Sequence, residues 1–123
     1  MAPTMHLTEE KYWDERDLYS GLIRLHILHH AEEEGVFGLG IIEELARHGY
    51  KLSPGTLYPL LRSMEKKGLL RSHEKLKGGK IRRMYRSTAR GPHALSMAKE
   101  KVYELFGVLF ENWPKRRGRG KRI

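Results

Sequence analysis

One short stretch of the sequence carries an unusual concentration of positive charge. Between residues 75 and 90 there are seven basic side chains and no acidic one, namely Lys75, Lys77, Lys80, Arg82, Arg83, Arg86 and Arg90. The pair Gly78-Gly79 lies inside this run and predicts a tight turn between two strands. A hairpin of this kind is typical of a surface that contacts nucleic-acid phosphates, here through Lys77, Lys80, Arg82 and Arg83. The alternative is a solvated hairpin without a partner, which the lack of a compensating carboxylate disfavours.

A second group of polar residues lies at the start of a predicted helix. Ser53 is a favoured N-cap residue and Pro54 is well tolerated at the first helical position, so the sequence predicts a helix from about residue 53 to 67. Its apolar residues recur at helical spacing, which leaves these residues for contact with phosphates or base edges: Ser53, Gly55, Thr56, Tyr58 and Arg62. A structural alternative stays open, in which Ser53 and Thr56 only cap the helix and Tyr58 only packs.

Signals for catalysis are weak throughout the chain. It has no cysteine, no glycine-rich phosphate loop and no HExxH motif, so we expect neither an enzyme nor a cofactor. His26, His29 and His30 bring imidazoles together on one predicted helix, and imidazole suits zinc or nickel. Because no carboxylate or cysteine accompanies them at matching spacing, no metal site is predicted. A metal-responsive repressor is kept as an alternative.

The length and the charge distribution narrow the class of protein. A chain of 123 residues has room for one domain. Its net charge of +9 is uneven, because residues 1–61 hold 5 basic and 10 acidic side chains whereas residues 62–123 hold 19 and 5. The second half is therefore expected to face a polyanion. No apolar run approaches the roughly 18 residues of a membrane span and no signal peptide is recognisable, so we expect a cytoplasmic protein without a membrane partner.

The order of the predicted elements indicates a fold. Apolar spacing predicts helices over residues 14–34, 39–48 and 53–67, strands over 69–76 and 81–87, and a long helix from 91 to 113. The predicted fold class is mainly α with a small β-hairpin, a winged helix-turn-helix plus a C-terminal dimerisation helix. We expect an N-terminal arm over 1–13, a DNA-binding domain over 14–90, the dimerisation helix over 91–113 and a disordered basic tail over 114–123.

The last predicted helix has an apolar stripe that exceeds what one small domain needs. The stripe consists of Leu95, Ala98, Val102, Leu105 and Leu109. A two-fold dimer through this helix would set two recognition helices about 34 Å apart, which matches successive major grooves of DNA. The expected partners are a second copy of the chain and a double-stranded operator with an inverted repeat. The alternative is a helix that folds back onto its own core.

Two longer motifs carry a family resemblance. The predicted recognition helix begins Leu-Ser-Pro-Gly-Thr-Leu-Tyr-Pro at residue 52, and the hairpin exit reads Tyr-Arg-Ser-Thr-Ala-Arg-Gly over residues 85–91. Together they resemble the PadR family of bacterial transcriptional regulators, over about residues 18–110. The single C-terminal helix is similar to the short-tailed subfamily. The chain departs from the family pattern at Ser87, where leucine is usual, and in its basic tail.

The resemblance implies a homodimeric winged-helix repressor that a small, often aromatic, molecule releases from DNA. It places this effector near the dimer interface, where Val102 and Tyr103 lie nearest the centre and Phe106 and Trp13 are further candidates. Two other interpretations stay open. One is a winged helix that binds RNA or other nucleic acid without sequence preference. The other is a protein-interaction module.

Overall fold

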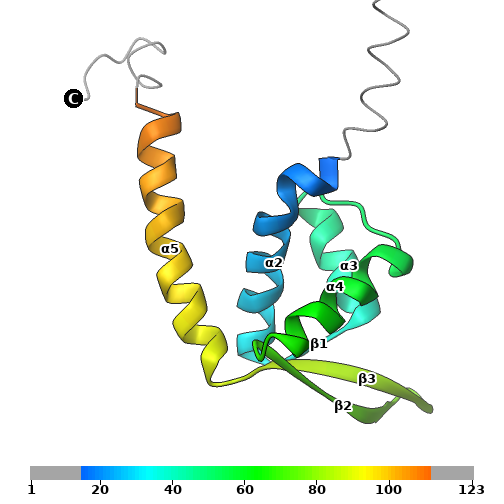
Figure 1. The fold of residues 1–123 in the computed structure, drawn as a ribbon. Coiled ribbons are helices and arrows are strands. Elements are labelled where there is room, and N and C mark those ends of the chain that lie inside the picture. Colours follow the sequence, from blue (N-terminus) through cyan, green and yellow to red (C-terminus); the bar gives the residue numbers. More distant parts are fainter. Residues whose placement is uncertain (1–14, 112–123) are drawn as a thin grey trace, which may run out of the picture.

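The computed structural model describes residues 15–111 and shows four helices and a small sheet in this range (Figure 1). In chain order these are α2 (Glu15–Glu33), β1 (Val36–Phe37), α3 (Gly38–Arg47), α4 (Pro54–Lys66), β2 (Leu70–Lys77), β3 (Lys80–Ser87) and α5 (Arg90–Leu109). This order confirms the predicted class, a mainly helical winged helix-turn-helix followed by a further helix. Within the described range, no helix is long and apolar enough to cross a membrane. The predicted arm, the basic tail and Trp13 lie outside the described residues.

The sheet has three antiparallel strands in the order β1-β3-β2. The hairpin of β2 and β3, residues 70–87, is called the wing below. Its two-residue turn is formed by Gly78 and Gly79, whose φ angles of 61° and 79° favour glycine. The predicted hairpin is therefore confirmed. β1 was not predicted, and it pairs Val36 with Tyr85 and Phe37 with Met84 of β3.

The register of the wing places like charges opposite each other. Lys77 faces Lys80 beside the turn, Lys75 faces Arg82, and Arg71 faces Arg86 near the base. Glu74 faces Arg83, the one oppositely charged pair along the two described strands. The positive charge that the sequence shows between residues 75 and 90 is thus gathered on one short two-stranded ribbon.

The hydrophobic core lies where the helices α2, α3 and α4 meet. Ile27 of α2, Leu45 of α3 and Leu57 and Leu61 of α4 are fully buried. Leu70 and Tyr85 close the core from the sheet, and Leu95 of α5 packs on it from the other side. The helix-turn-helix and the wing therefore share one core, which fixes the position of α4 relative to the wing.

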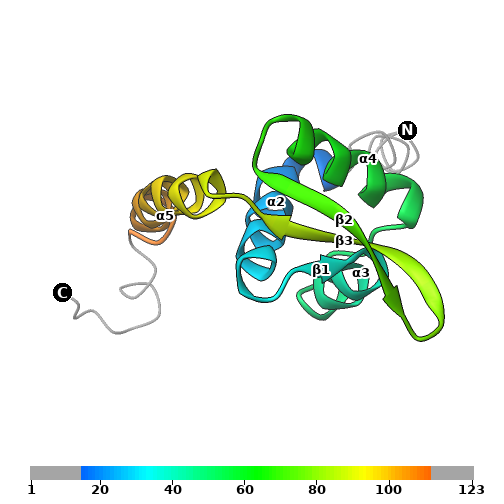
Figure 2. The ribbon, with the colours of Figure 1, turned by 90° about the horizontal axis from the view of Figure 1, so that it is seen from below.

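Helix α5 begins against the core and then leaves it. Gly91 and Leu95 are buried, whereas the following turns are exposed. Both ribbon views show α5 beside the base of α2, at the opposite end of the molecule from the tip of the wing (Figures 1 and 2). The helix ends at Leu109, with Phe110 as its C-cap, rather than continuing to residue 113. Trp113 lies outside the described residues.

A close contact between α3 and α4 gives a first prediction. A Cβ atom added to Gly38 would overlap the phenol ring of Tyr58, which is half-buried. We expect Gly38→Ala to lower the free energy of unfolding by about 1 to 3 kcal/mol, because the ring must shift within a packed site. Urea unfolding followed by circular dichroism measures this.

The matched control is Gly40→Ala on the same helix, where an added Cβ meets nothing within 4 Å. It should be neutral or stabilising, because alanine favours helix more than glycine does. In a Tyr58→Ala background the cost of Gly38→Ala should fall. Equal losses for Gly38→Ala and Gly40→Ala would show that the contact with Tyr58 is not what requires glycine.

Candidate nucleic-acid interface

The start of α4 presents small polar groups to solvent. Ser53 is the N-cap in extended conformation, and its hydroxyl donates a hydrogen bond of 3.4 Å to Oγ1 of Thr56 rather than capping a backbone N–H. Ser53, Gly55 and Arg62 are exposed, and Thr56 is half-buried. At Gly55 the closest atom to an added Cβ would be Oγ of Ser53 at 3.8 Å, so the backbone is open to a close approach from outside. These features suit a helix end that meets a phosphate backbone or base edges.

Tyr58 differs from the other residues predicted on α4. Its ring packs against Gly38 at the start of α3 and against the core. This position gives Tyr58 a structural role, which was the alternative that the sequence left open. A contact between Tyr58 and DNA stays a prediction.

The wing holds the predicted lysines at its tip. Lys77 and Lys80 are exposed and flank the turn. Arg82 lies two residues after Lys80 on β3 and is half-buried. Nζ of Lys77 lies 5.0 Å from the centre of the Phe37 ring, a cation–π contact with β1. Lys77 therefore also ties the wing to the start of α3.

Arg83 takes part in a chain of polar contacts that joins the wing to α4. Its Nη1 donates to Oγ of Ser72 at 2.9 Å, and that hydroxyl donates to Oε2 of Glu65 on α4 at 2.8 Å. Nη2 of Arg83 lies 3.9 Å from Oε2 of Glu74. Ser72, Glu65 and Glu74 were missed from the sequence, because their roles depend on strand register and on the packing of β2 against α4. Arg83 positions the wing, and its charge is partly neutralised.

The start of α4 and the tip of the wing lie on the same side of the molecule. Figures 1 and 2 both show them at the end away from α5. The predicted contacts on α4 and on the wing are therefore brought together on one side. Two elements on one side, a helix N-terminus and a basic ribbon, have the arrangement of a winged-helix surface for duplex nucleic acid.

The apolar stripe of α5 is divided between two environments. Leu95 is buried and Ala98 half-buried against the winged domain, so the first part of the helix does pack on its own core. Val102, Leu105 and Leu109 are exposed, as are the predicted effector residues Tyr103 and Phe106. The rings of Phe106 and Phe110 lie 4.8 Å apart. Leu18 and Leu22 of α2 are exposed as well. The far half of α5 thus carries apolar surface that residues 15–111 of one chain do not cover.

Thr88 is the joint between the winged domain and α5. Its hydroxyl donates to the carbonyl of Gly68 at 2.6 Å and accepts from the backbone N–H of Arg90 at 3.1 Å. The carbonyl of Thr88 accepts from the N–H of Gly91. One side chain therefore binds the first backbone N–H of α5 and also the carbonyl of Gly68 in the turn that follows α4. Ser87 contacts the same turn, since an added Cβ at Gly91 would overlap its Oγ atom.

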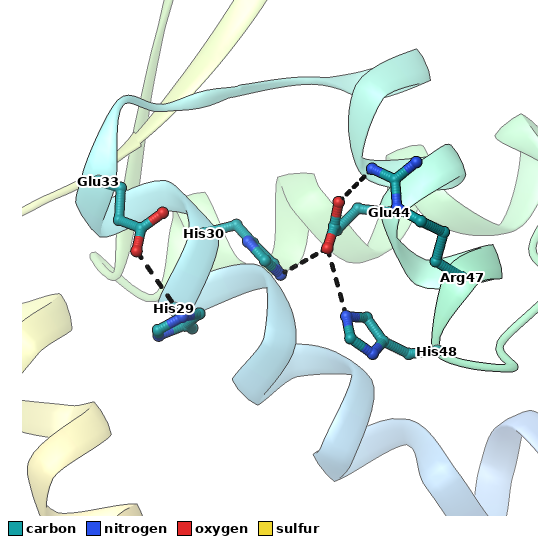
Figure 3. A network of polar contacts seen from close by, with 6 residues as sticks. All are labelled: His29, His30, Glu33, Glu44, Arg47 and His48. Atoms are coloured by element: carbon teal, nitrogen blue, oxygen red, sulfur yellow. Dashed lines mark hydrogen bonds and ion pairs between the residues drawn. The ribbon is translucent and has the colours of Figure 1, made fainter.

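The histidines form a different group from the predicted one. Nε2 of His29 points to Glu33 at 3.8 Å, whereas Nε2 of His30 and of His48 lie 3.7 and 3.2 Å from Oε2 of Glu44 (Figure 3). Burial lowers the pKa of His26 below its usual value, and the neighbouring imidazoles add to this. The hydrogen bond from Arg47 lowers the pKa of Glu44. The converging nitrogens are thus those of His26, His30 and His48, which comes from the end of α3. The ring of His29 packs edge-on against His30 at 5.1 Å, and its Nε2 faces Glu33.

Comparison with known proteins identifies the family to which these elements belong. A model of the "Transcriptional regulator PadR-like family" matches residues 27–97, which include α3, α4 and the wing. The chain belongs to this family. The resemblance inferred from the recognition-helix and hairpin-exit motifs is confirmed.

Individual relatives agree with this assignment. The chain is 46% identical over 90 residues to the transcriptional regulator Rv3488 of Mycobacterium tuberculosis, covering 73% of this chain and 84% of the relative. The crystal structure of a PadR family transcriptional regulator from Eggerthella lenta superposes with a TM-score of 0.72 at 28% identity, covering 87% of this chain and 95% of that one. A PadR-like regulator from Bacillus cereus gives 0.63 at 26% identity, with coverages of 85% and 99%. All three relatives are named as transcriptional regulators.

The joint at Thr88 gives a second prediction. Thr88→Val keeps the shape of the side chain and removes the hydrogen bonds of the hydroxyl with Gly68, Leu69 and Arg90, which leaves the carbonyl of Gly68 without this donor. We expect a loss of about 1 to 3 kcal/mol in the free energy of unfolding. Urea unfolding measures this loss. Thr88→Ser retains the hydroxyl and should lose clearly less, so identical losses in the two variants would assign the effect to the methyl group.

Proposed function

We propose that this PadR-like regulator is a homodimeric repressor that binds an inverted-repeat operator in double-stranded DNA and is released by a small, aromatic effector. The observation that carries the proposal is the position of the start of α4 and the basic wing on one side, with the uncovered apolar half of α5 at the opposite end. A bacterial regulator of this kind must reach the chromosome, which lies in the cytoplasm. We therefore place the protein in the cytoplasm.

The DNA-binding step divides between α4 and the wing. The first turn of α4, with Ser53, Gly55 and Thr56, enters the major groove, and Arg62 reaches a flanking phosphate. Lys80 and Arg82 contact phosphates from the wing. Arg83 holds the wing against α4 through Ser72, so its contribution to affinity is smaller than that of Lys80.

The dimer forms through the exposed half of α5. Val102, Leu105 and Leu109 meet the same residues or α2 of the second copy, where Leu18 and Leu22 are exposed. The effector binds next to this interface, against Val102, Tyr103 and Phe106. An effector bound there changes the angle between the two copies and with it the spacing of the two α4 helices, which blocks simultaneous contact with both half-sites.

The test of this function is selection from a random duplex library with the full-length protein at two salt concentrations. We expect a two-fold symmetric motif with half-sites about one helical turn apart. The alternatives predict other outcomes. Binding without an enriched motif that vanishes at moderate salt, together with retention on single-stranded RNA, would contradict the operator and favour a non-specific nucleic-acid or RNA-binding protein.

The wing gives a third prediction. Lys80→Ala and Arg82→Ala should each weaken binding to every duplex and lower the slope of log K against log[salt] by about one, because one phosphate contact releases about one counterion. Fluorescence anisotropy at four or more salt concentrations measures the slope. Lys99→Ala on α5 is the matched control, since Lys99 is an exposed lysine on the helix away from the wing. A slope that changes equally in Lys80→Ala and Lys99→Ala would remove the wing from the interface.

The dimer gives a fourth prediction. Leu105 is 50% exposed in the single chain, and Leu105→Glu would bury two unpaired carboxylates in a two-fold interface. We expect the dimer dissociation constant to rise by roughly 100-fold or more. Sedimentation velocity over a concentration series measures it. Leu39→Glu on α3 is the control, because Leu39 is 52% exposed and lies away from α5. A dimer that survives Leu105→Glu unchanged would contradict an interface through α5.

A further inference from the structure

Three imidazoles from two helices converge beside the helix-turn-helix. His26 and His30 lie one turn apart on α2, and His48 is the C-cap residue of α3. One ring nitrogen from each of the three lies within 4.8 Å of those of the other two. The rings of His26 and His48 are 4.6 Å apart, and Tyr50 packs edge-on against His26 at 5.4 Å. His26 and His30 are half-buried, so the group is partly shielded from solvent while His48 closes it from outside.

We propose that His26, His30 and His48 form a binding site for a divalent transition-metal ion of the zinc class. Three neutral imidazoles are a common ligand set for Zn²⁺, and the fourth position is left for water or a carboxylate. A tetrahedral ion with bonds of about 2.1 Å needs its nitrogen ligands about 3.4 Å apart. The present separation of up to 4.8 Å is closed by rotation of the side chains, because His48 is exposed and has room to turn.

Glu44 completes the group as a carboxylate held in place next to the imidazoles. Arg47 hydrogen-bonds its Oε1 atom, which leaves Oε2 directed at His30 and His48 (Figure 3). A carboxylate in this position supplies the fourth ligand or orients a histidine ligand through its second nitrogen. His30 and Glu44 also line a cavity of about 630 Å³ between the end of α2, α3 and the wing, which His26 and His48 do not border.

The proposed metal site joins α2, on which α5 packs, to the end of α3, which leads into α4. His26 and His30 belong to α2, against which α5 begins, whereas His48 ends α3 and precedes the turn into α4. A bound ion therefore fixes the end of α3 to α2 and with it the entry of α4. This regulatory step rests on the proposed DNA-binding function, but the metal site itself does not.

The binding test uses full-length protein freed of metal with a chelator and titrated with Zn²⁺ in competition with a chromophoric chelator. We expect one ion per chain and a rise of several degrees in Tm with excess Zn²⁺. Co²⁺ as a second probe should give visible absorption of a four-coordinate site. His48→Gln and His30→Gln should each weaken zinc binding at least tenfold and abolish the rise in Tm.

The matched control is His29→Gln, which removes an exposed histidine of the same helix that touches His30 but does not contribute a converging nitrogen, since its Nε2 faces Glu33. It should bind Zn²⁺ as the unchanged protein does. The Tm of each variant measured without metal shows whether that variant is folded. Because His48 is exposed, we expect His48→Gln to keep the fold. Failure to bind one Zn²⁺ per chain, or equal losses in His29→Gln and His48→Gln, would overturn the site.

The regulatory step is tested on the selected operator duplex with and without Zn²⁺. We expect the operator affinity of the unchanged protein to change at least threefold, and that of His48→Gln to stay constant. Equal affinities in the unchanged protein would overturn the regulatory step. Loss of operator binding under both conditions would instead contradict the proposed function, whereas the zinc titration, which contains no DNA, would stand by itself.

Discussion

The packing of α3 against α4 is the constraint on which the rest of the structure depends. Leu45 and Leu57 are fully buried at this crossing, and the two helices approach closely enough that Gly38 has no room for a side chain. Because the sheet closes the same core, the angle of α4 and the position of the wing are set together. The start of α4, the wing and the end of α3 therefore keep fixed relative positions. A displacement of one of them shifts the others.

Much of the fold could be predicted because its signals are local. Ser53-Pro54 marks the start of α4, Gly78-Gly79 marks the turn of the wing, and the structure confirms both. β1 could not be predicted, because Val36 and Phe37 become a strand only by pairing with β3, far along the chain. The end of α5 at Leu109 also differed from the expected end, since the apolar spacing continues beyond the helix.

In the candidate sites, too, the features that depend on neighbouring residues in the sequence could be predicted, whereas those that depend on tertiary packing could not. The basic residues of the wing were evident from composition, but the partners of Arg83 on β2 and α4 required the strand register and the tertiary packing. Among the histidines, the ring of His29 contacts that of His30, but its Nε2 faces Glu33 and lies outside the converging group. His48 entered the group because α2 and α3 cross, which no spacing along the sequence indicates. The sequence left open whether Tyr58 packs or faces DNA, and its packing against Gly38 likewise depends on how two helices meet.

The register of the wing has a consequence for its own stability. Lys77 faces Lys80, Lys75 faces Arg82 and Arg71 faces Arg86, and like charges directly opposite each other weaken a strand pair. The hairpin is thus held together by its backbone hydrogen bonds and its turn against electrostatic repulsion at three of its eight cross-strand pairs. Phosphates placed along the ribbon would cancel that repulsion. Duplex DNA would then act as a counterion for the wing, so that part of the favourable binding free energy would come from relief of repulsion within the protein itself.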